Sequence, residues 1–169
     1  MKKSSLLVLL LFFVAAINVR GQESSASSEP LLTLDGVPNE GFGAGLMVGD
    51  PFGVSLKYWL NETWAIDGGL GYSWRGRDGF HIHSDVLYHF FDLIDIDKGR
   101  LPLYFGVGAR VHFERHSDDH VGIRGPVGVA YLFEDKPVDV FLEVAPVLDF
   151  TPDTKFRFTA AAGARYWFR

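Results

Sequence analysis

One segment near the C-terminus constrains the fold more than any other: KFRFTAAAGARYWF, Lys155–Phe168. Successive side chains of a β-strand point to opposite faces, so every second residue shares a face. One face would then hold Phe156, Phe158, three alanines, Tyr166 and Phe168, while the other holds the lysine and both arginines. Aromatic residues at both ends and small residues between them are typical of a strand that crosses a bilayer. The segment therefore predicts a membrane-spanning β-strand with one apolar and one cationic face.

Turn signals recur from Gly41 onward at intervals of about 10 to 18 residues, and no helical period appears. The connections between the apolar segments are short and polar, and none is long enough for a parallel crossover. The sequence therefore predicts an all-β fold, an eight-stranded antiparallel up-and-down transmembrane β-barrel with short turns. The predicted strands are Gly41–Gly49, Phe52–Leu60, Thr63–Arg75, Phe80–Phe91, Leu101–Arg115, His120–Glu134, Val138–Phe150 and Thr154–Phe168.

Each predicted strand repeats this alternation, and its aromatic residues fall mainly at its ends. Two girdles of aromatic residues follow from the pattern, one at each rim of the barrel. Two prolines, Pro126 and Pro146, lie in mid-strand and predict bulges, because proline lacks the amide donor that a ladder needs. The predicted girdles comprise Tyr58, Trp64, Tyr88, Tyr131, Tyr166 and Phe168 at one rim and Trp74, Phe113, Phe150, Phe156 and Phe158 at the other.

The face that points inward is not decided by alternation, since a soluble barrel that binds an apolar ligand would place its apolar residues inside. Three observations favour a polar interior. The polar set contains most of the strand glycines, which a crowded eight-stranded lumen needs and a water-facing surface does not. The charges of that set balance, as buried charges must. The aromatic girdles have no purpose in a soluble core.

The predicted lumen contains seven basic and seven acidic residues, which we expect to form a closed network of salt bridges. Side chains fill the interior of an eight-stranded barrel, so a conducting channel is not expected. The basic residues are Lys57, Arg75, Arg110, Arg124, Lys155, Arg157 and Arg165, and the acidic residues are Asp67, Asp85, Glu114, Glu134, Asp139, Glu143 and Asp149.

The first 21 residues have the form of a secretory signal peptide, with Lys2 and Lys3 before an apolar run. The segment 22–40 is rich in Ser, Pro and acidic residues and predicts a flexible lead-in to a barrel that spans 41–169. Cleavage after Gly21 would leave 13 basic against 21 acidic residues, a net charge of −8, which disfavours nucleic acid as a partner.

The absence of Cys excludes a disulfide scaffold and a thiolate metal site.

In strand number, alternation, girdles and signal peptide, the chain resembles the small eight-stranded outer-membrane β-barrels, the class of OmpX and the membrane domain of OmpA. The resemblance covers Gly41–Arg169 and implies a monomer in the outer membrane of a Gram-negative cell envelope, in contact with outer-membrane lipid. The terminal Tyr166-Trp167-Phe168 resembles the signal that such proteins present to the barrel assembly machinery, although Arg169 follows it. The loops here are short, which does not favour an adhesin.

Two groups of residues suggest chemistry. His81, His83, Asp85 and His89 share one face of a strand, and His112, Glu114, His116 and His120 lie on or near the next hairpin, so both groups offer metal-ligand types. His-Ser-Asp also occurs twice, at 83–85 and 116–118, and a Ser–His pair would suit a lipid A-modifying enzyme of the PagL or PagP kind. We expect instead that these residues are lumen or loop groups, with no metal, no cofactor and no catalytic role.

The preferred function is a non-enzymatic, porin-like envelope protein with a structural or small-ligand role. The lipid A-modifying enzyme and the soluble periplasmic barrel are the alternatives.

Overall fold

The computed structural model describes residues 41–73, 79–115 and 118–168. The predicted signal peptide (1–21) and lead-in segment (22–40) lie outside the described residues. No helix in the described part of the chain is long and apolar enough to cross a membrane.

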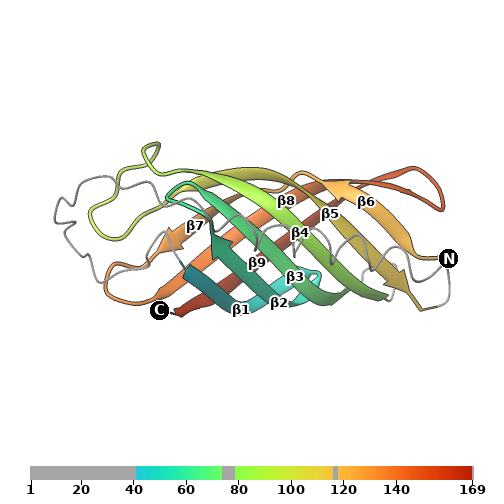
Figure 1. Ribbon diagram of the computed structural model, residues 1–169, viewed down its shortest axis with the longest axis horizontal. Coiled ribbons are helices and arrows are strands. Elements are labelled where there is room, and N and C mark those ends of the chain that lie inside the picture. Colours follow the sequence, from blue (N-terminus) through green and yellow to red (C-terminus); the bar gives the residue numbers. More distant parts are fainter. Residues whose placement is uncertain (1–40, 74–78, 116–117, 169) are drawn as a thin grey trace, which may run out of the picture. The chain divides into compact units, whose positions relative to one another are not determined.

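The described chain is a succession of antiparallel strands that coil around one axis (Figure 1). Their bounds differ from the predicted ones by one or two residues at most ends, and strand β3 ends at Ser73 with residues 74–78 outside the described part. The strands are β1 (Gly41–Asp50), β2 (Phe52–Trp59), β3 (Trp64–Ser73), β4 (Gly79–Phe90), β5 (Leu103–Glu114), β6 (His120–Arg124), β7 (Val127–Leu132), β8 (Val138–Thr151) and β9 (Lys155–Phe168).

The sheet closes on itself. Strands β1 to β5 pair in sequence order, β5 pairs with both β6 and β7, these pair with β8, β8 pairs with β9, and β9 returns to β1. Because β6 and β7 occupy successive lengths of one position between β5 and β8, the ring has eight positions. The prediction of an eight-stranded antiparallel barrel is confirmed.

The predicted sixth strand is interrupted at Gly125-Pro126, where β6 ends and β7 begins. The wall stays joined across the break: the Gly125 amide donates to the Pro146 carbonyl at 3.0 Å, and the Gly106 amide donates to the Pro126 carbonyl at 2.9 Å. The bulge predicted at Pro146 is wrong, because β8 runs through that residue, which pairs with Phe158. The irregularity of β8 lies instead in its pairing with β6, where the register shifts between Val121 and Gly122.

The interior of the barrel contains the buried charged side chains together with a few large apolar ones, such as Trp59 and Phe141, whereas most apolar side chains of the strands face outward. In a soluble barrel, Phe156, Leu142 and Val127 would pack together inside and Glu143 would face water. Here Phe156 is 62% exposed, Leu142 56% and Val127 56%, whereas Glu143 is buried. This orientation is the opposite of the one that the soluble-barrel alternative requires. Register keeps each strand in this orientation, because a shift by one residue would turn every side chain of the strand to the other face.

The barrel has two rims. The terminal rim is the end where β1 begins and β9 ends, and the distal rim is the end with the β1–β2, β3–β4, β5–β6 and β8–β9 connections. Aromatic rings contact one another outside the terminal rim, where the Trp64 and Tyr88 centroids lie 5.1 Å apart. At the distal rim the Phe156 and Phe158 rings lie 5.0 Å apart. The predicted girdle residues that the structure describes are all on the outward face: Tyr58, Trp64, Tyr88, Phe113, Tyr131, Phe150, Phe156, Phe158, Tyr166 and Phe168. Trp74 lies outside the described residues.

Closure of the ring depends on a close approach of β1 to β9. Nine residue pairs join these strands, from Phe42 opposite Phe168 to Asp50 opposite Ala160. At Gly45 a Cβ atom would collide with the Ala164 carbonyl oxygen and would lie 2.6 Å from the Arg165 Cα. Both contacts are with backbone, which cannot move aside without opening the ladder.

We therefore expect Gly45→Ala to weaken closure, lowering the free energy of unfolding by about 1–3 kcal/mol, the usual range for overpacking. Gly68→Ala is the matched control, because a Cβ there would lie 3.6 Å from the nearest atom, the His83 carbonyl oxygen. Urea unfolding in detergent micelles measures both. Equal effects of the two substitutions would show that the β1–β9 approach does not limit closure.

Candidate functional site: the ion-pair network of the lumen

Arg165 joins two carboxylates near the middle of the lumen. Its Nε donates to Asp139 Oδ1 at 3.0 Å, and its Nη1 donates to Asp67 Oδ1 at 2.5 Å. The second Asp139 oxygen accepts a hydrogen bond from Trp167 Nε1 at 3.0 Å. All four side chains are buried. Each ion has therefore lost its hydration and depends on its partners for compensation.

Arg124 forms the second group, together with residues of β4 and β8. Its Nη2 contacts Glu143 Oε1 closely, and its Nε lies 3.4 Å from Asp85 Oδ2. The other Glu143 oxygen accepts a hydrogen bond from the Tyr104 hydroxyl at 3.1 Å. Strands that are not ladder neighbours, such as β4 and β6, are thus joined through the interior as well.

Arg110 and Arg157 converge on one carboxylate, Asp149, nearer the distal rim. Arg110 binds it in a bidentate manner, with Nη2 2.9 and 2.6 Å from the two oxygens and Nε 3.0 Å from Oδ1. Arg157 Nε lies 3.4 Å from Asp149 Oδ2, and its side chain is about one-third exposed. The planar fork of a guanidinium matches a carboxylate in this way, whereas an ammonium does not.

Lys57 belongs to a different environment, an aromatic cluster toward the terminal rim. Its Nζ donates to His89 Nε2 at 2.7 Å and lies about 5 Å from the ring centres of Trp59 and Tyr104. The Nδ1 of His89 then carries the proton and donates to the Thr63 carbonyl at 3.2 Å. Sequence reasoning placed Lys57 in the salt-bridge network and missed this lysine–imidazole pair, which depends on the register of β2 and β4.

Large rings close the lumen at this end. Trp59 and Trp167 lie 6.0 Å apart, and Trp59 and His89 lie 4.4 Å apart. Glycines on the facing strands provide the room: a Cβ at Gly43 would lie 3.0 Å from the Trp167 ring, and one at Gly163 would lie 2.6 Å from the Phe141 ring. This observation explains why the polar face is rich in glycine.

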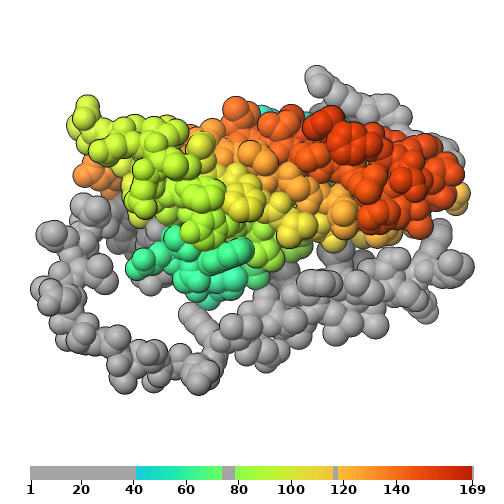
Figure 2. Space-filling model, turned by 90° about the horizontal axis from the view of Figure 1, so that it is seen from above, coloured from blue at the N-terminus to red at the C-terminus, as the bar shows by residue number. Residues whose placement is uncertain are grey.

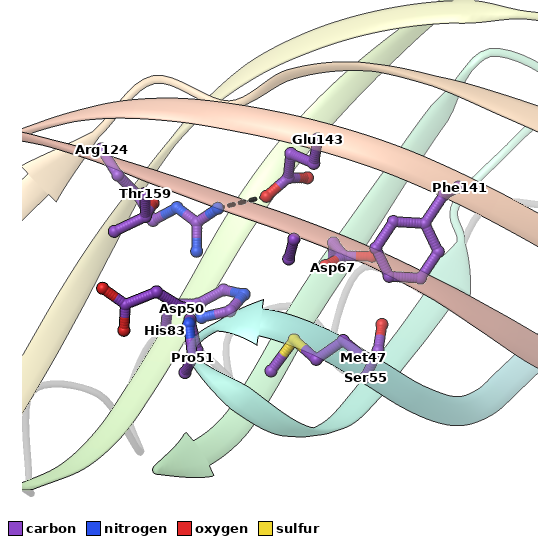
Figure 3. Close-up of a pocket in the computed structure, with 11 residues that line it drawn as sticks. Met47, Asp50, Pro51, Ser55, Asp67, His83, Arg124, Phe141, Glu143 and Thr159 are labelled. Carbon is purple, nitrogen blue, oxygen red and sulfur yellow. Dashed lines mark hydrogen bonds and ion pairs between the residues drawn. The ribbon is translucent and has the colours of Figure 1, made fainter. Parts of the chain in front are cut away.

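A small inner cavity of about 10 Å³ lies among the ion pairs, which is room for about one water molecule. In Figure 3 the Arg124–Glu143 ion pair lies on one side of this space and Asp50, His83 and Met47 lie on the other.

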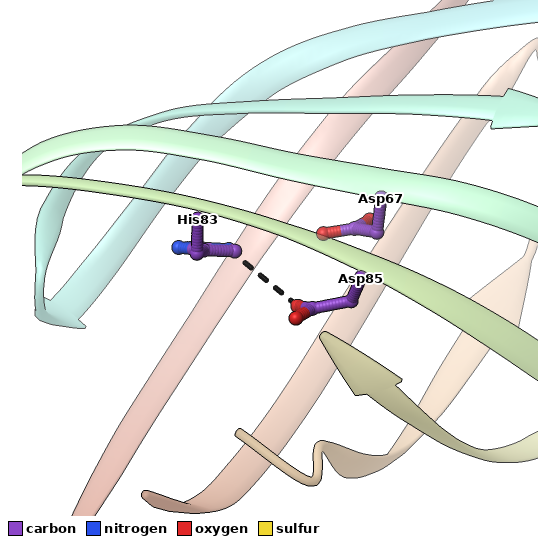
Figure 4. Close-up of side chains that lie close together, drawn as sticks. All are labelled: Asp67, His83 and Asp85. Atoms are coloured by element: carbon purple, nitrogen blue, oxygen red, sulfur yellow. Dashed lines mark ion pairs between the residues drawn. The ribbon is translucent and has the colours of Figure 1, made fainter. Parts of the chain in front are cut away.

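Asp67, His83 and Asp85 bring one imidazole and two carboxylates together, with one ligand atom of each within 4.8 Å of the others (Figure 4). His83 Nε2 lies 3.9 Å from Asp85 Oδ2. This donor set suits a transition metal, yet guanidinium groups already face both carboxylates: Arg165 at Asp67 and Arg124 at Asp85. The trio is a part of the ion-pair network.

The remaining histidines continue from this trio toward the distal rim. His81 Nε2 lies 3.0 Å from His83 Nδ1, and the ring centres of His81 and His112 are 6.2 Å apart. His120 Nδ1 donates to the Thr151 carbonyl at 2.8 Å, and its Nε2 lies 3.6 Å from Glu114 Oε2.

The first His-Ser-Asp repeat does not place its serine on the same face of the strand as its histidine. His83 and Asp85 are buried in the lumen, and Ser84, between them, has the opposite orientation on the strand. Of the second repeat, His116 and Ser117 lie outside the described residues, and Asp118 is exposed.

Two predicted lumen residues lie elsewhere. Glu134 is exposed in the connection that follows β7, because that strand ends at Leu132. Lys155 begins β9 at the distal rim, where its Nζ lies 3.1 Å from the exposed Asp153 carboxylate. Alternation assigns a face but not the point where a strand ends, and both errors arise at strand ends. Arg75 lies outside the described residues.

Comparisons with known proteins find a similar fold. The structure is similar to the crystal structure of the N-terminal β-barrel domain of Pseudomonas aeruginosa OprF, with a TM-score of 0.57 over 79% of this chain and 99% of that domain. The sequence identity is 15%, so the similarity is one of fold. No protein-family model matches the chain, and no curated protein sequence matches it significantly.

The Arg110–Asp149 pair allows the network to be tested. We expect Arg110→Met or Asp149→Leu alone to lower the free energy of unfolding by about 3–5 kcal/mol, because the first removes the closest partner of Asp149 and the second the closest partner of Arg110. The double variant should lose less than the sum, since both members of the close pair are then gone. Lys155→Met is the control, because an exposed pair contributes about 0–1 kcal/mol. Urea unfolding in micelles gives all four values, and additive losses would argue against a coupled pair.

Proposed function

We propose that the protein is an integral β-barrel of the bacterial outer membrane, exported by its N-terminal segment. One observation carries the proposal: the polarity of the barrel is inverted relative to a soluble protein. Between the two rims the outward side chains are aliphatic and exposed, such as Leu46 (64%) and Val107 (63%), while Arg165 and Asp149 inside are 2% and 0% exposed. An apolar surface of this extent needs a cover, and a bilayer bounded by aromatic girdles provides one.

The role that we propose is structural, in the integrity of the cell envelope, with a lumen that does not conduct. The rings of Trp59 and Trp167 and the ion pairs of Arg124 and Arg165 support this proposal, because together they occupy the axis. A barrel whose interior is fixed by ion pairs is rigid and gives ions no continuous path of water.

We also propose that the protein is not an enzyme and acts as a monomer. The opposed orientations of His83 and Ser84 support this view, since a nucleophile must lie within hydrogen-bond reach of its base. The proposed partners are outer-membrane lipid and, through the aromatic residues of β9, the barrel assembly machinery. Nucleic acid is not among them.

A charge on the outward face distinguishes a membrane barrel from a soluble one. We expect Leu142→Arg to reduce the fraction of folded, membrane-integrated protein, because an arginine at the bilayer midplane costs about 2–4 kcal/mol. Leu93→Arg is the matched control: Leu93 is similarly exposed (61% against 56%) but lies in the β4–β5 connection. The measurement is fractionation of the membranes of a Gram-negative host, followed by gel mobility with and without boiling.

The parent chain should enter the outer-membrane fraction and change its mobility on boiling. Release of the parent chain by osmotic shock without detergent, or a Leu142→Arg variant that behaves as Leu93→Arg does, would contradict a membrane location.

A further inference from the structure

The barrel wall has unequal height at the distal rim. Pairing of β1 with β9 ends where Asp50 faces Ala160, but β9 continues for the five residues Lys155–Thr159, which pair with β8. Figure 1 shows the β1–β2 hairpin ending well short of the β8–β9 hairpin, and Figure 2 shows β8 and β9, in orange and red, forming one end of the barrel. Beside β9 the wall is therefore lower by several residues.

A cavity of about 770 Å³ occurs where the wall is lower, and its volume is in the range of small-molecule sites. Its lining is of two kinds. Ser73, Arg110, His112, His120, Asp149 and Arg157 come from the lumen face, whereas Val48, Phe52, Val144 and Phe158 come from the outward face. The cavity thus connects the charged interior with the apolar exterior through the side of the barrel, and not only along its axis.

The polar end of this cavity contains two guanidinium groups and two carboxylates. Arg110 and Arg157 both lie against one of these carboxylates, Asp149. His112 is 6% exposed, and its Nε2 has no hydrogen-bond partner among the described residues. The other carboxylate of the lining, Asp50, is the last residue of β1 and also borders the small inner cavity. An oxyanion near Arg157 and His112 would receive donors from both.

The apolar end faces the region that the proposed function assigns to lipid. Phe158 is 67% exposed and Val48 54%, and Phe158 belongs to the distal girdle, at the level where the head groups of one leaflet would lie. A chain of methylene groups along these side chains would continue directly into the hydrocarbon of that leaflet.

We propose that this lateral cavity binds an acyl-chain amphiphile with an oxyanion head group, taken from the surrounding leaflet. The head lies against Arg157, Arg110 and His112, and the tail leaves the barrel over Ala160 and Phe158. The inference rests on the proposed function, because the tail requires a membrane around the barrel. Guanidinium groups suit the head, since they bind phosphate and carboxylate oxygens through paired donors.

A photoactivatable analogue of dodecyl phosphate, with a diazirine in its chain, tests the inference on the full-length protein in phosphatidylcholine nanodiscs. We expect cross-linking to the β9 segment 158–165 that unlabelled dodecyl phosphate suppresses. Dodecyl maltoside, which has the same chain and a neutral head, and inorganic phosphate, which has no chain, should not suppress it.

Two pairs of variants locate the site. Arg157→Gln should reduce the suppressible cross-linking about tenfold, the effect of one lost charge-assisted contact, and Lys155→Gln, two residues away and outside the cavity lining, should not. Ala160→Trp should block the tail, whereas Ala164→Trp, on the same face of β9 but outside the lining, should not. Boiling-dependent gel mobility verifies that each variant is folded.

The outcomes separate this inference from the proposed function. A protein that does not enter nanodiscs as a heat-modifiable barrel contradicts the proposed function. A folded barrel overturns the inference if no competitor suppresses β9 cross-linking, if dodecyl maltoside competes equally, or if inorganic phosphate alone does so. The first of these measurements uses the parent chain, so the inference can fail even where a variant does not fold.

Discussion

The pairing of buried charges is the constraint on which the rest of this structure depends. Nine charged side chains are buried in the described barrel: Lys57, Asp67, Asp85, Arg110, Arg124, Asp139, Glu143, Asp149 and Arg165. Each would be severely destabilising alone, and each lies beside a partner from another strand. The pairs therefore join strands through the lumen, both ladder neighbours such as β8 and β9 and more distant strands such as β3 and β9. Glycines opposite the large rings let this interior fit within eight strands.

Most of the fold could be predicted from the sequence, because the period of two is a local property. Phe156 and Arg157 differ in polarity at adjacent positions, and that difference alone assigns them to opposite faces. The choice of inward face needed a second argument, and glycines such as Gly128 and Gly163 supplied it: a Cβ at either would collide with a ring, of Tyr104 or Phe141. The failures arose where no local signal exists. Glu134 continues the alternation of β7 in the sequence, but it lies beyond the end of that strand. Pro146 pairs normally in β8 although it has no backbone N–H to donate.

The sequence predicts which charged residues make up the site, but not which of them contact each other. The seven-to-seven balance of charges indicated a paired interior, yet Arg165 and Asp67 are 98 residues apart in the chain and meet only because the ring closes. The same is true of Lys57 and His89, 32 residues apart, whose contact makes a lysine the partner of an imidazole and not of a carboxylate. The lateral cavity depends on a difference in height between two hairpins, which the sequence encodes only through the positions of two turns.

The position of Arg165 on the final strand has a consequence for biogenesis. Asp67 and Asp139 are synthesised earlier than this arginine, and both depend on it for their counter-ion. A sheet that still lacks β9 leaves these two acidic groups on its concave side without the arginine. Arrival of the last strand thus supplies their counter-ion at the same moment as it seals the seam with β1.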